Sequence, residues 1–208
     1  MIPLFVDCTG KKVVIFGGGE VAARKAARFA QKADVLVISR SFSKRCRILP
    51  VHFQELDTKT VPDQKINNII KNAFLVIAAL SDIHENNRIG HLCRKNQVLF
   101  NNADGENGDV VIPAVSQGRH YVLAISTQGQ SPAISRYIRQ EIETRYPTLD
   151  AMIELQGRLR ERLKTAKLSQ AERSAILWKV LNDQQTWKSL RYSPDDTLAE
   201  VERRYLHD

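Results

Sequence analysis

Short apolar runs alternate with amphipathic stretches over the first 113 residues of the chain. Runs that are apolar at every position are typical of strands buried on both faces of a parallel sheet, and apolar residues spaced three or four apart indicate helices. The pattern predicts strands at residues 12–16, 35–39, 51–56, 74–79 and 98–102, the third of them at a sheet edge, and helices at residues 21–32 and 84–95. This order predicts a parallel α/β sheet.

The pattern changes near Pro113. Residues 109–113 and 120–126 have the composition of two strands, and the turn at Gln117-Gly118 between them predicts an antiparallel hairpin. Ser131 followed by Pro132 is typical of a helix N-cap with proline at the first helical position, so we expect a helix from there to about Tyr146.

Only helical patterns follow Pro147. Ser169 and Glu172 have the spacing of a capping box, and Ser193-Pro194 is a second start signal. Helices are predicted at about 148–167, 169–182 and from 193 onward. We therefore expect three domains: the α/β sheet at residues 1–113, a small α+β segment at 114–147 and a helical domain at 148–208.

A glycine-rich turn joins the first strand to the first helix. The segment Gly17-Gly18-Gly19-Glu20-Val21-Ala22 fits the G-x-G-x-x-A pattern of dinucleotide-binding folds. The first glycine permits the tight turn, the second lets backbone approach a pyrophosphate, and Ala22 lets helix and strand pack closely. Amide groups at the positive end of the helix would hold the phosphates. The position of the motif predicts a Rossmann-like sheet in which residues 17–21 contact a dinucleotide cofactor.

The end of the second strand leaves the choice between NAD and NADP open. An acid at this position would accept the ribose 2′-hydroxyl group, but the chain has Ser39-Arg40. Arg40 is suited either to binding a 2′-phosphate or to stacking on adenine. Stacking on adenine would not discriminate between NAD and NADP. We assign both residues to the cofactor site.

Four sequence blocks occur together in the order typical of one family. They are Gly17–Lys25, Ile77–Asp82 with Asn87 beyond it, Asn101–Asp104 followed by Val111–Pro113, and Ala124–Pro132. On these blocks the chain resembles the precorrin-2 dehydrogenase / sirohydrochlorin ferrochelatase family, the siroheme synthase module, over about residues 1–146. The helical tail matches only in length, helicity and basic character.

This resemblance implies an NAD-dependent removal of two hydrogens from precorrin-2, which gives sirohydrochlorin. In some family members the same site inserts Fe²⁺ to make siroheme, and the resemblance leaves that second activity open for this chain. It also implies a homodimer in which residues 114–147 cross between subunits, and a helical tail that helps to enclose the tetrapyrrole.

Asp104 is the predicted catalytic residue. It follows the fifth strand, at the carboxyl edge where doubly wound sheets bind ligands. A carboxylate beside the nicotinamide would take a proton or orient the pyrrole N–H group that loses it, and metal insertion also strips protons from pyrrole nitrogens. By spacing alone, Asp104-Gly105 is equally well an ordinary turn. The family resemblance favours the catalytic interpretation.

Polar residues at two further strand ends complete the predicted cofactor site. Ser81 and Asp82 follow the fourth strand and are expected beside the adenosine half, although both also suit an N-cap of the next helix. Ala79, the last residue of that strand, is assigned to the same cofactor site. The resemblance places Asn102 beside the nicotinamide; an ordinary amide at a strand end is the alternative.

The loop before the helix at 132 is the predicted substrate site. Ser126, Thr127, Gly129 and Ser131 lead into a helix N-terminus, which suits a substrate carboxylate. Ser131 is also explained by simple N-capping. Arginines at 136, 139 and 158–162 suit carboxylates but equally suit a solvated face, so none is assigned individually.

Composition narrows the remaining classes of function. The net charge of +8 suits either an anionic partner or an ordinary solvated surface, and the eight carboxylates of the tetrapyrrole that the resemblance implies fit the first. Nucleic-acid binding is not predicted, because no RNA-binding aromatic motif, zinc finger or basic zipper accompanies the charge. A dinucleotide-sensing regulatory domain is the alternative to an enzyme, but such domains usually carry an acid where this chain has Ser39-Arg40.

Predictions about metal binding, membrane insertion and cellular compartment rest on motifs that the sequence lacks. The five histidines, His207 included, show no metal-ligand spacing, so no metal site is predicted. Three cysteines without C-x-x-C spacing predict neither a disulfide framework nor a zinc cage, and thus a reducing cytoplasm. No apolar run is long enough for a membrane span, and no secretory signal is expected at the start of the chain.

Overall fold

The computed structural model describes residues 1–206, which form two compact units. The first unit is Met1–Ile112 and the second begins at Pro113. No helix within the described residues is long and apolar enough to cross a membrane.

The first unit contains a five-stranded parallel sheet with the strand order β3-β2-β1-β4-β5. The strands are β1 Lys12–Phe16, β2 Asp34–Ser39, β3 His52–Glu55, β4 Leu75–Ala78 and β5 Leu99–Asn102. All five lie within a residue of the predicted positions, and the alternating β3 lies at the edge. The reversal of chain order between β1 and β4 places a binding crevice at the carboxyl ends of these strands.

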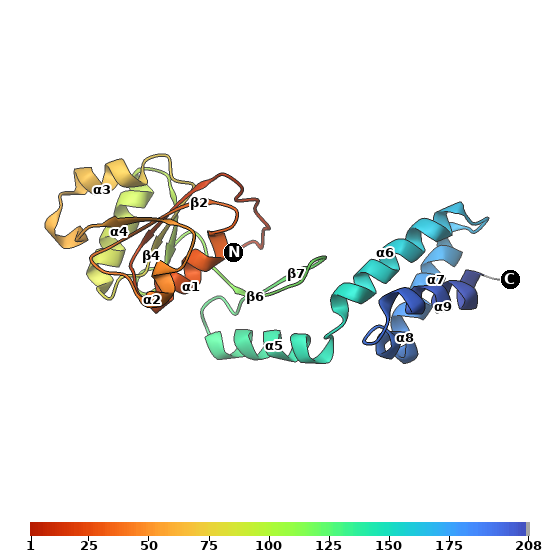
Figure 1. The fold of residues 1–208 in the computed structure, drawn as a ribbon. Coiled ribbons are helices and arrows are strands. Elements are labelled where there is room, and N and C mark those ends of the chain that lie inside the picture. Colours follow the sequence, from red (N-terminus) through yellow and green to blue (C-terminus); the bar gives the residue numbers. More distant parts are fainter. Residues whose placement is uncertain (207–208) are drawn as a thin grey trace. The chain divides into compact units, whose positions relative to one another are not determined.

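Helices cover both faces of this sheet (Figure 1). The helices are α1 Glu20–Phe29, α2 Lys44–Arg47, α3 Asp63–Ile70 and α4 Ile83–Lys95, with a short 3₁₀ helix η1 at Thr58–Thr60. One core packs α1 and α2 against inward residues such as Ile15 and Ile77. The other packs α3 and α4 against the opposite face, around Phe16 and Val76. Burial on both faces explains why the central strands β1 and β4 are apolar at nearly every position.

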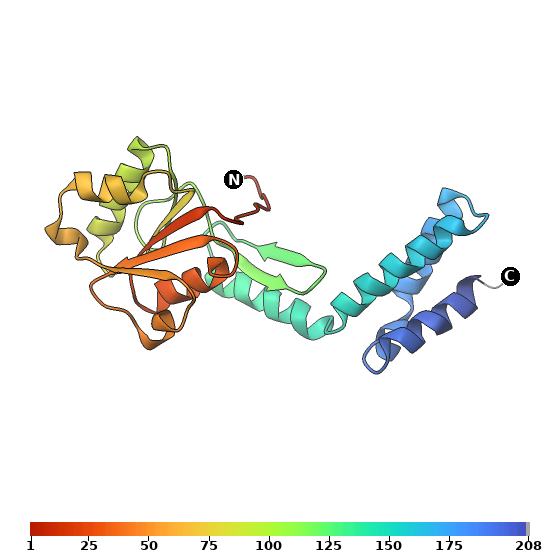
Figure 2. The same ribbon diagram turned by 45° about the horizontal axis from the view of Figure 1, so that its top comes forward.

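Unit two begins with an antiparallel hairpin, β6 Ala114–Gln117 and β7 Val122–Ile125, which contacts α5 Pro132–Arg145 (Figure 2). The N-cap prediction is confirmed, because the Ser131 hydroxyl accepts a hydrogen bond from the Ile134 amide. The hairpin is also confirmed.

The prediction for the first strand of the hairpin was wrong, since residues 109–113 form no strand. Val110 and Ile112 are instead packed against the core of the first unit, and Val110 makes a backbone hydrogen bond to Phe100. The apolar residues at 109–113 therefore reflect packing of their side chains against the core, not pairing of the segment in a β-sheet. The strand begins at Ala114, and the turn spans 118–121.

The remaining helices are α6 Leu149–Thr165, α7 Gln170–Asn182, α8 Gln184–Ser189 and α9 Pro194–Leu206. They share a separate core around Leu155, Leu159 and Val180. The predicted capping box at the start of α7 is present, with the Ser169 and Glu172 side chains each accepting from the other's backbone amide. The short α8 was not predicted.

Asp150, in the first turn of α6, holds the tip of the hairpin. Its carboxylate accepts hydrogen bonds of 2.8 Å from the amides of both Arg119 and His120. Gly118 lies against the same carboxylate, so that a side chain there would clash with it. The two amides, His120 first, lower the pKa of the Asp150 carboxyl because they bind its charged form.

This latch predicts a pH dependence of the hairpin. Because the folded-state pKa is lowered, the stabilisation is complete above the carboxyl's ordinary pKa of 3.8 and is lost as pH falls through the lower folded value. Asp150→Asn should remove that dependence and speed amide hydrogen exchange at residues 118–121 about tenfold. Glu161→Gln, an equal loss of charge farther along α6, should leave that exchange unchanged. Equal exchange in all three proteins would contradict the latch.

Candidate cofactor site and the loop that carries Asp104

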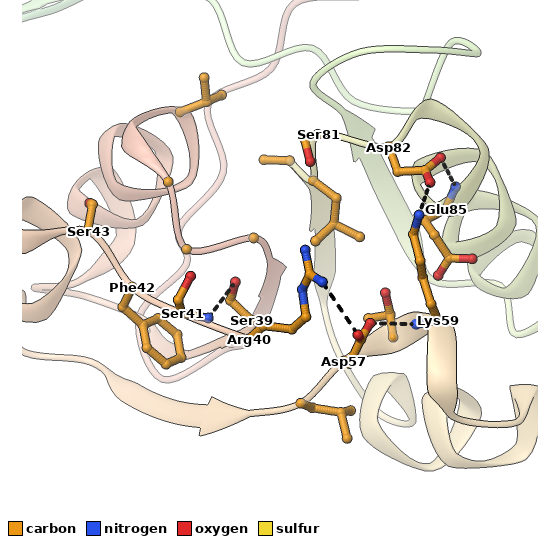
Figure 3. Close-up of a pocket in the computed structure, with 18 of the residues that line it drawn as sticks. Ser39, Arg40, Ser41, Phe42, Ser43, Asp57, Lys59, Ser81, Asp82 and Glu85 are labelled. Carbon is orange, nitrogen blue, oxygen red and sulfur yellow. Dashed lines mark hydrogen bonds and ion pairs between the residues drawn. The ribbon is translucent and has the colours of Figure 1, made fainter.

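A cavity of about 630 Å³ opens at the carboxyl ends of β1, β2 and β4 (Figure 3). Every residue predicted to contact the cofactor lines it, except Asn102. The lining comprises Gly17, Gly18, Gly19, Glu20, Val21, Ser39, Arg40, Ser41, Phe42, Ser43, Leu56, Asp57, Thr58, Lys59, Ala79, Leu80, Ser81, Asp82 and Glu85. Four separate segments of sequence therefore meet at one edge of the sheet.

Each glycine of the turn has a different structural role. Gly17 has φ +127°, and a side chain there would clash with the carbonyl of Ala79. Gly18 lies against the carbonyl of Ser41, so it too has no room for a side chain. Gly19, the N-cap of α1, has open space where a side chain would project. Open space beside the amides of a helix N-terminus fits a pyrophosphate.

Two ion pairs lie in the cavity (Figure 3). Arg40 Nη1 lies 3.7 Å from Asp57 Oδ2, and Lys59 pairs with Asp82. Lys59 lowers the pKa of the Asp82 carboxyl, helped by the amide of Glu85, and Asp82 in turn raises the pKa of Lys59. Asp82 also caps α4 by accepting from the amides of His84 and Glu85. The capping interpretation of Asp82 is thus confirmed, and Asp82 rather than Ser81 is the N-cap of α4.

Asn86, a fully buried amide on α4, connects the cavity to the segment that carries Asp104. Its Oδ1 accepts from the Leu80 amide at 3.0 Å, and its Nδ2 donates to the Leu80 carbonyl at 3.1 Å. The same Nδ2 donates to the carbonyl of Asp104 at 3.2 Å. One side chain therefore fixes the ends of both β4 and β5.

Asp104 is exposed and lies in a loop ordered by amide side chains. Asn102 Oδ1 accepts from the Asp104 amide at 3.3 Å, and Asn102 Nδ2 donates to the carbonyl of Glu106 and to Asn87 Oδ1. Asn87 Oδ1 also accepts from the Glu106 amide. The side-chain amide of Asn102 therefore makes its hydrogen bonds within the loop. The catalytic role of Asp104 and the cofactor contact of Asn102 stay predictions.

A half-buried lysine contacts the start of this loop. Lys25 Nζ donates to Asn101 Oδ1 at 2.7 Å, and Asn101 Nδ2 donates to the Val110 carbonyl at 2.7 Å. Burial, with Arg24 and Arg28 nearby, lowers the pKa of Lys25 to about 8. The pair closes the base of the loop between β5 and Val110, so Lys25 and Asn101 shape the segment without lining the cavity.

The predicted substrate residues lie together in the second unit, at the start of α5. Thr127 Oγ1 accepts from the Ser131 amide at 3.0 Å and donates to the Ser131 carbonyl at 2.9 Å. Ser126 Oγ accepts from the Gln128 amide, and Gly129 has a φ of +85° that suits glycine. These bonds order the loop. Binding of substrate by its residues stays a prediction.

Sequence patterns missed one wall of the cavity, residues 56–59, which follow β3. This segment carries no local motif, and only the pairing of β3 with β2 brings it to the cavity. Within residues 1–206, no three His, Cys, Asp or Glu side chains gather as a metal site. His207 lies outside the described residues.

Comparisons with known proteins agree with this architecture. An NAD(P)-binding family model matches residues 4–114, and a model described as sirohaem biosynthesis protein, central, matches residues 123–145. The solved structure of SirC, a precorrin-2 dehydrogenase, covers 98% of this chain and is itself covered completely, with a TM-score of 0.70 at 24% identity. That likeness confirms the Rossmann-like sheet with a small antiparallel sheet and a helical C-terminal region.

Curated relatives extend the likeness over most of the sequence. A siroheme synthase of Neisseria meningitidis is 30% identical over 96% of this chain, which spans 41% of that longer protein. The precorrin-2 dehydrogenase of Methanosarcina barkeri is 42% identical over 92% of this chain and 88% of its own length. The chain therefore belongs to the precorrin-2 dehydrogenase family.

Proposed function

We propose that this protein dehydrogenates precorrin-2 to sirohydrochlorin with NAD in siroheme biosynthesis. The observation that carries the proposal is the glycine-walled cavity at the carboxyl ends of β1, β2 and β4, in a chain whose relatives include a precorrin-2 dehydrogenase. The regulatory alternative has no support from the relatives described above. A nicotinamide cofactor supplies the hydride acceptor.

The residues of the chain divide the remaining work. Amides of Gly18, Gly19 and the first turn of α1 bind the pyrophosphate, while the 39–43 and 79–82 segments hold the adenosine half. As a hydride leaves the substrate for the cofactor, a proton must also leave, and the Asp104 carboxylate accepts it or orients the N–H group that loses it. The loop at 126–131 binds substrate carboxylates.

Insertion of Fe²⁺ is the second activity that we propose. The siroheme synthase of Neisseria meningitidis matches nearly the whole of this chain, which spans 41% of that protein, and this match supports the second activity. Insertion replaces the protons on two pyrrole nitrogens by the metal, and a carboxylate at position 104 can accept those protons. Iron is here a substrate held by the tetrapyrrole.

An apolar stripe on α5 supports the proposed homodimer. Ile134, Tyr137 and Ile138 are 48%, 59% and 39% exposed and lie on one face of the helix, at positions i, i+3 and i+4. Exposed apolar side chains grouped in this way are typical of association surfaces. We propose that segment 114–147 pairs with a second copy of the chain through this stripe.

The cysteines support a cytoplasmic location for the protein. Cys46 and Cys93 are buried and Cys8 is partly exposed, and all three are free thiols. Free thiols persist in reducing compartments.

The dehydrogenase proposal predicts that precorrin-2 and NAD yield NADH with this protein. Asp104→Asn should lower kcat roughly 10²- to 10⁴-fold, the range for loss of a general acid or base. Glu106→Gln is the matched control, because it removes an exposed charge from the same loop and should keep activity near that of the wild type. The assay follows NADH absorbance. Absence of NADH would refute the proposed function, and full activity of Asp104→Asn would refute only the role of that residue.

The chelatase proposal predicts faster conversion of sirohydrochlorin to siroheme by Fe²⁺ than in buffer alone. Asp104→Asn should slow insertion because the pyrrole protons lose their acceptor, whereas Glu106→Gln should not. Anaerobic absorbance spectra of the macrocycle measure the rate. A rate no higher than in buffer would leave a dehydrogenase without the second activity.

The dimer proposal predicts a solution mass of twice the chain's 23.6 kDa. Tyr137→Glu should shift the protein toward monomer, because it places a charge in the apolar stripe. Ile48→Glu, an equal change at an exposed position of the first unit, should not. Light scattering after size exclusion gives the mass, and a monomeric wild-type protein at micromolar concentration would contradict the proposal.

A further inference from the structure

The end of β2 lacks the group that commonly selects between NAD and NADP. In Rossmann-like sheets an acid about twenty residues after the glycine turn accepts the ribose 2′-hydroxyl group. Here that position holds Ser39, Arg40 and Ser41, all of which line the cavity. The backbone of this segment is fixed, because the Ser43 amide donates to the Gly18 carbonyl at 2.8 Å.

Four carboxylates line the cavity within the described residues. Three of them contact residues other than Arg40. Glu85 pairs with Arg88 at 3.2 Å. Asp82 caps α4 and pairs with Lys59. Glu20 begins α1 and points toward Arg45, with an N···O distance of 3.8 Å. Asp57, the fourth, is the carboxylate that contacts Arg40 at the end of β2.

Strand register places Asp57 there. Ser39 pairs with Glu55 in the parallel ladder between β2 and β3, and the Leu56 amide donates to the Ser39 carbonyl at 3.0 Å. Asp57 follows directly, at the same edge of the sheet, with its side chain 29% exposed. Figure 3 shows its carboxylate facing the Arg40 side chain.

The two oxygens of the Asp57 carboxylate have different surroundings. Oδ1 accepts from the Lys59 amide at 3.0 Å, which caps η1 and orients the carboxylate. Oδ2 lies 3.7 Å from Arg40 Nη1, beyond hydrogen-bond distance, so the ion pair leaves this oxygen able to accept a hydrogen bond. An oriented carboxylate beside the predicted adenosine subsite suits a hydroxyl donor.

We propose that Asp57 accepts the 2′-hydroxyl group of the adenosine ribose and so selects NAD over NADP, an inference that rests on the proposed function. In this chain the acid follows β3, the strand adjacent to β2, and does not lie at the end of β2 itself. A 2′-phosphate would bring close to two negative charges against this carboxylate. Arg40 attracts such a phosphate less than it would alone, because the Asp57 carboxylate lies beside it and repels the same group.

Binding affinities test this without any turnover. Isothermal titration of the full chain with NAD and with NADP should show at least tenfold tighter binding of NAD. Asp57→Asn should weaken NAD binding about tenfold, as expected for loss of a charged hydrogen-bond acceptor, and should tighten NADP binding because Arg40 is released. The amide oxygen of asparagine can still accept from Lys59, so η1 keeps its cap.

Two further variants sharpen the result. Glu55→Gln removes an equal charge from β3 at a residue outside the cavity lining, and the NAD-to-NADP affinity ratio should stay that of the wild type. Arg40→Ala added to Asp57→Asn should abolish the gain in NADP affinity.

The outcomes separate the two hypotheses. A wild-type protein that binds neither dinucleotide refutes the proposed function and this inference with it. If NAD binds but Asp57→Asn leaves the ratio unchanged, or if Glu55→Gln shifts it equally, only the role of Asp57 is refuted. Tighter binding of NADP by the wild type also overturns the inference.

Discussion

Close backbone approach at Gly17 and Gly18 is the constraint on which the candidate site depends. Hydrogen bonds of 2.8 Å from Gly17 to Ile38 and of 2.7 Å from Ala79 to Phe16 bind the end of β1 to both neighbouring strands. The carbonyls of Ala79 and Ser41 occupy the space that side chains at 17 and 18 would need. Only glycine lets these three strand ends converge, and their convergence aims the first turn of α1 into the cavity.

The same edge of the sheet extends to Asp104 through buried amides. Asn86 hydrogen-bonds both Leu80, in the cavity wall, and the carbonyl of Asp104, so the two loops share one fixed anchor. An amide suits this position because it donates and accepts at once, and a carboxylate or an aliphatic side chain would leave buried backbone groups unpaired. Catalysis between two bound molecules requires such shared positioning, since small displacements of reacting groups are costly.

Sequence patterns predicted the elements whose burial is unambiguous. Strands β1 and β4 are apolar on both faces, and the cap signals at Ser131 and Ser169 fixed two helix starts to the residue. The segment 57–70 was missed because its helices are short and polar, with only Thr58, Ile66 and Ile70 buried among its residues.

The candidate site was predictable only where its residues belong to a local sequence motif. The glycine turn and the residues after β4 are local motifs, and all of them line the cavity. Asp57 has no local motif, and its place beside Arg40 depends on the register between β2 and β3. Likewise the bonds of Asn86 join residues 18 positions apart. The sequence places such residues on elements, but only tertiary pairing brings them together.

Charge in the cavity differs in sign from that of the whole chain. Among the described residues, its lining has four carboxylates and only two cations, Arg40 and Lys59, and each cation is paired with an acid. Net positive side-chain charge therefore does not hold the anionic pyrophosphate, and backbone amide dipoles at α1 must do so. The excess that gives the chain its +8 lies outside the cavity. A polyanionic tetrapyrrole can then be attracted to the protein without competing for the dinucleotide site.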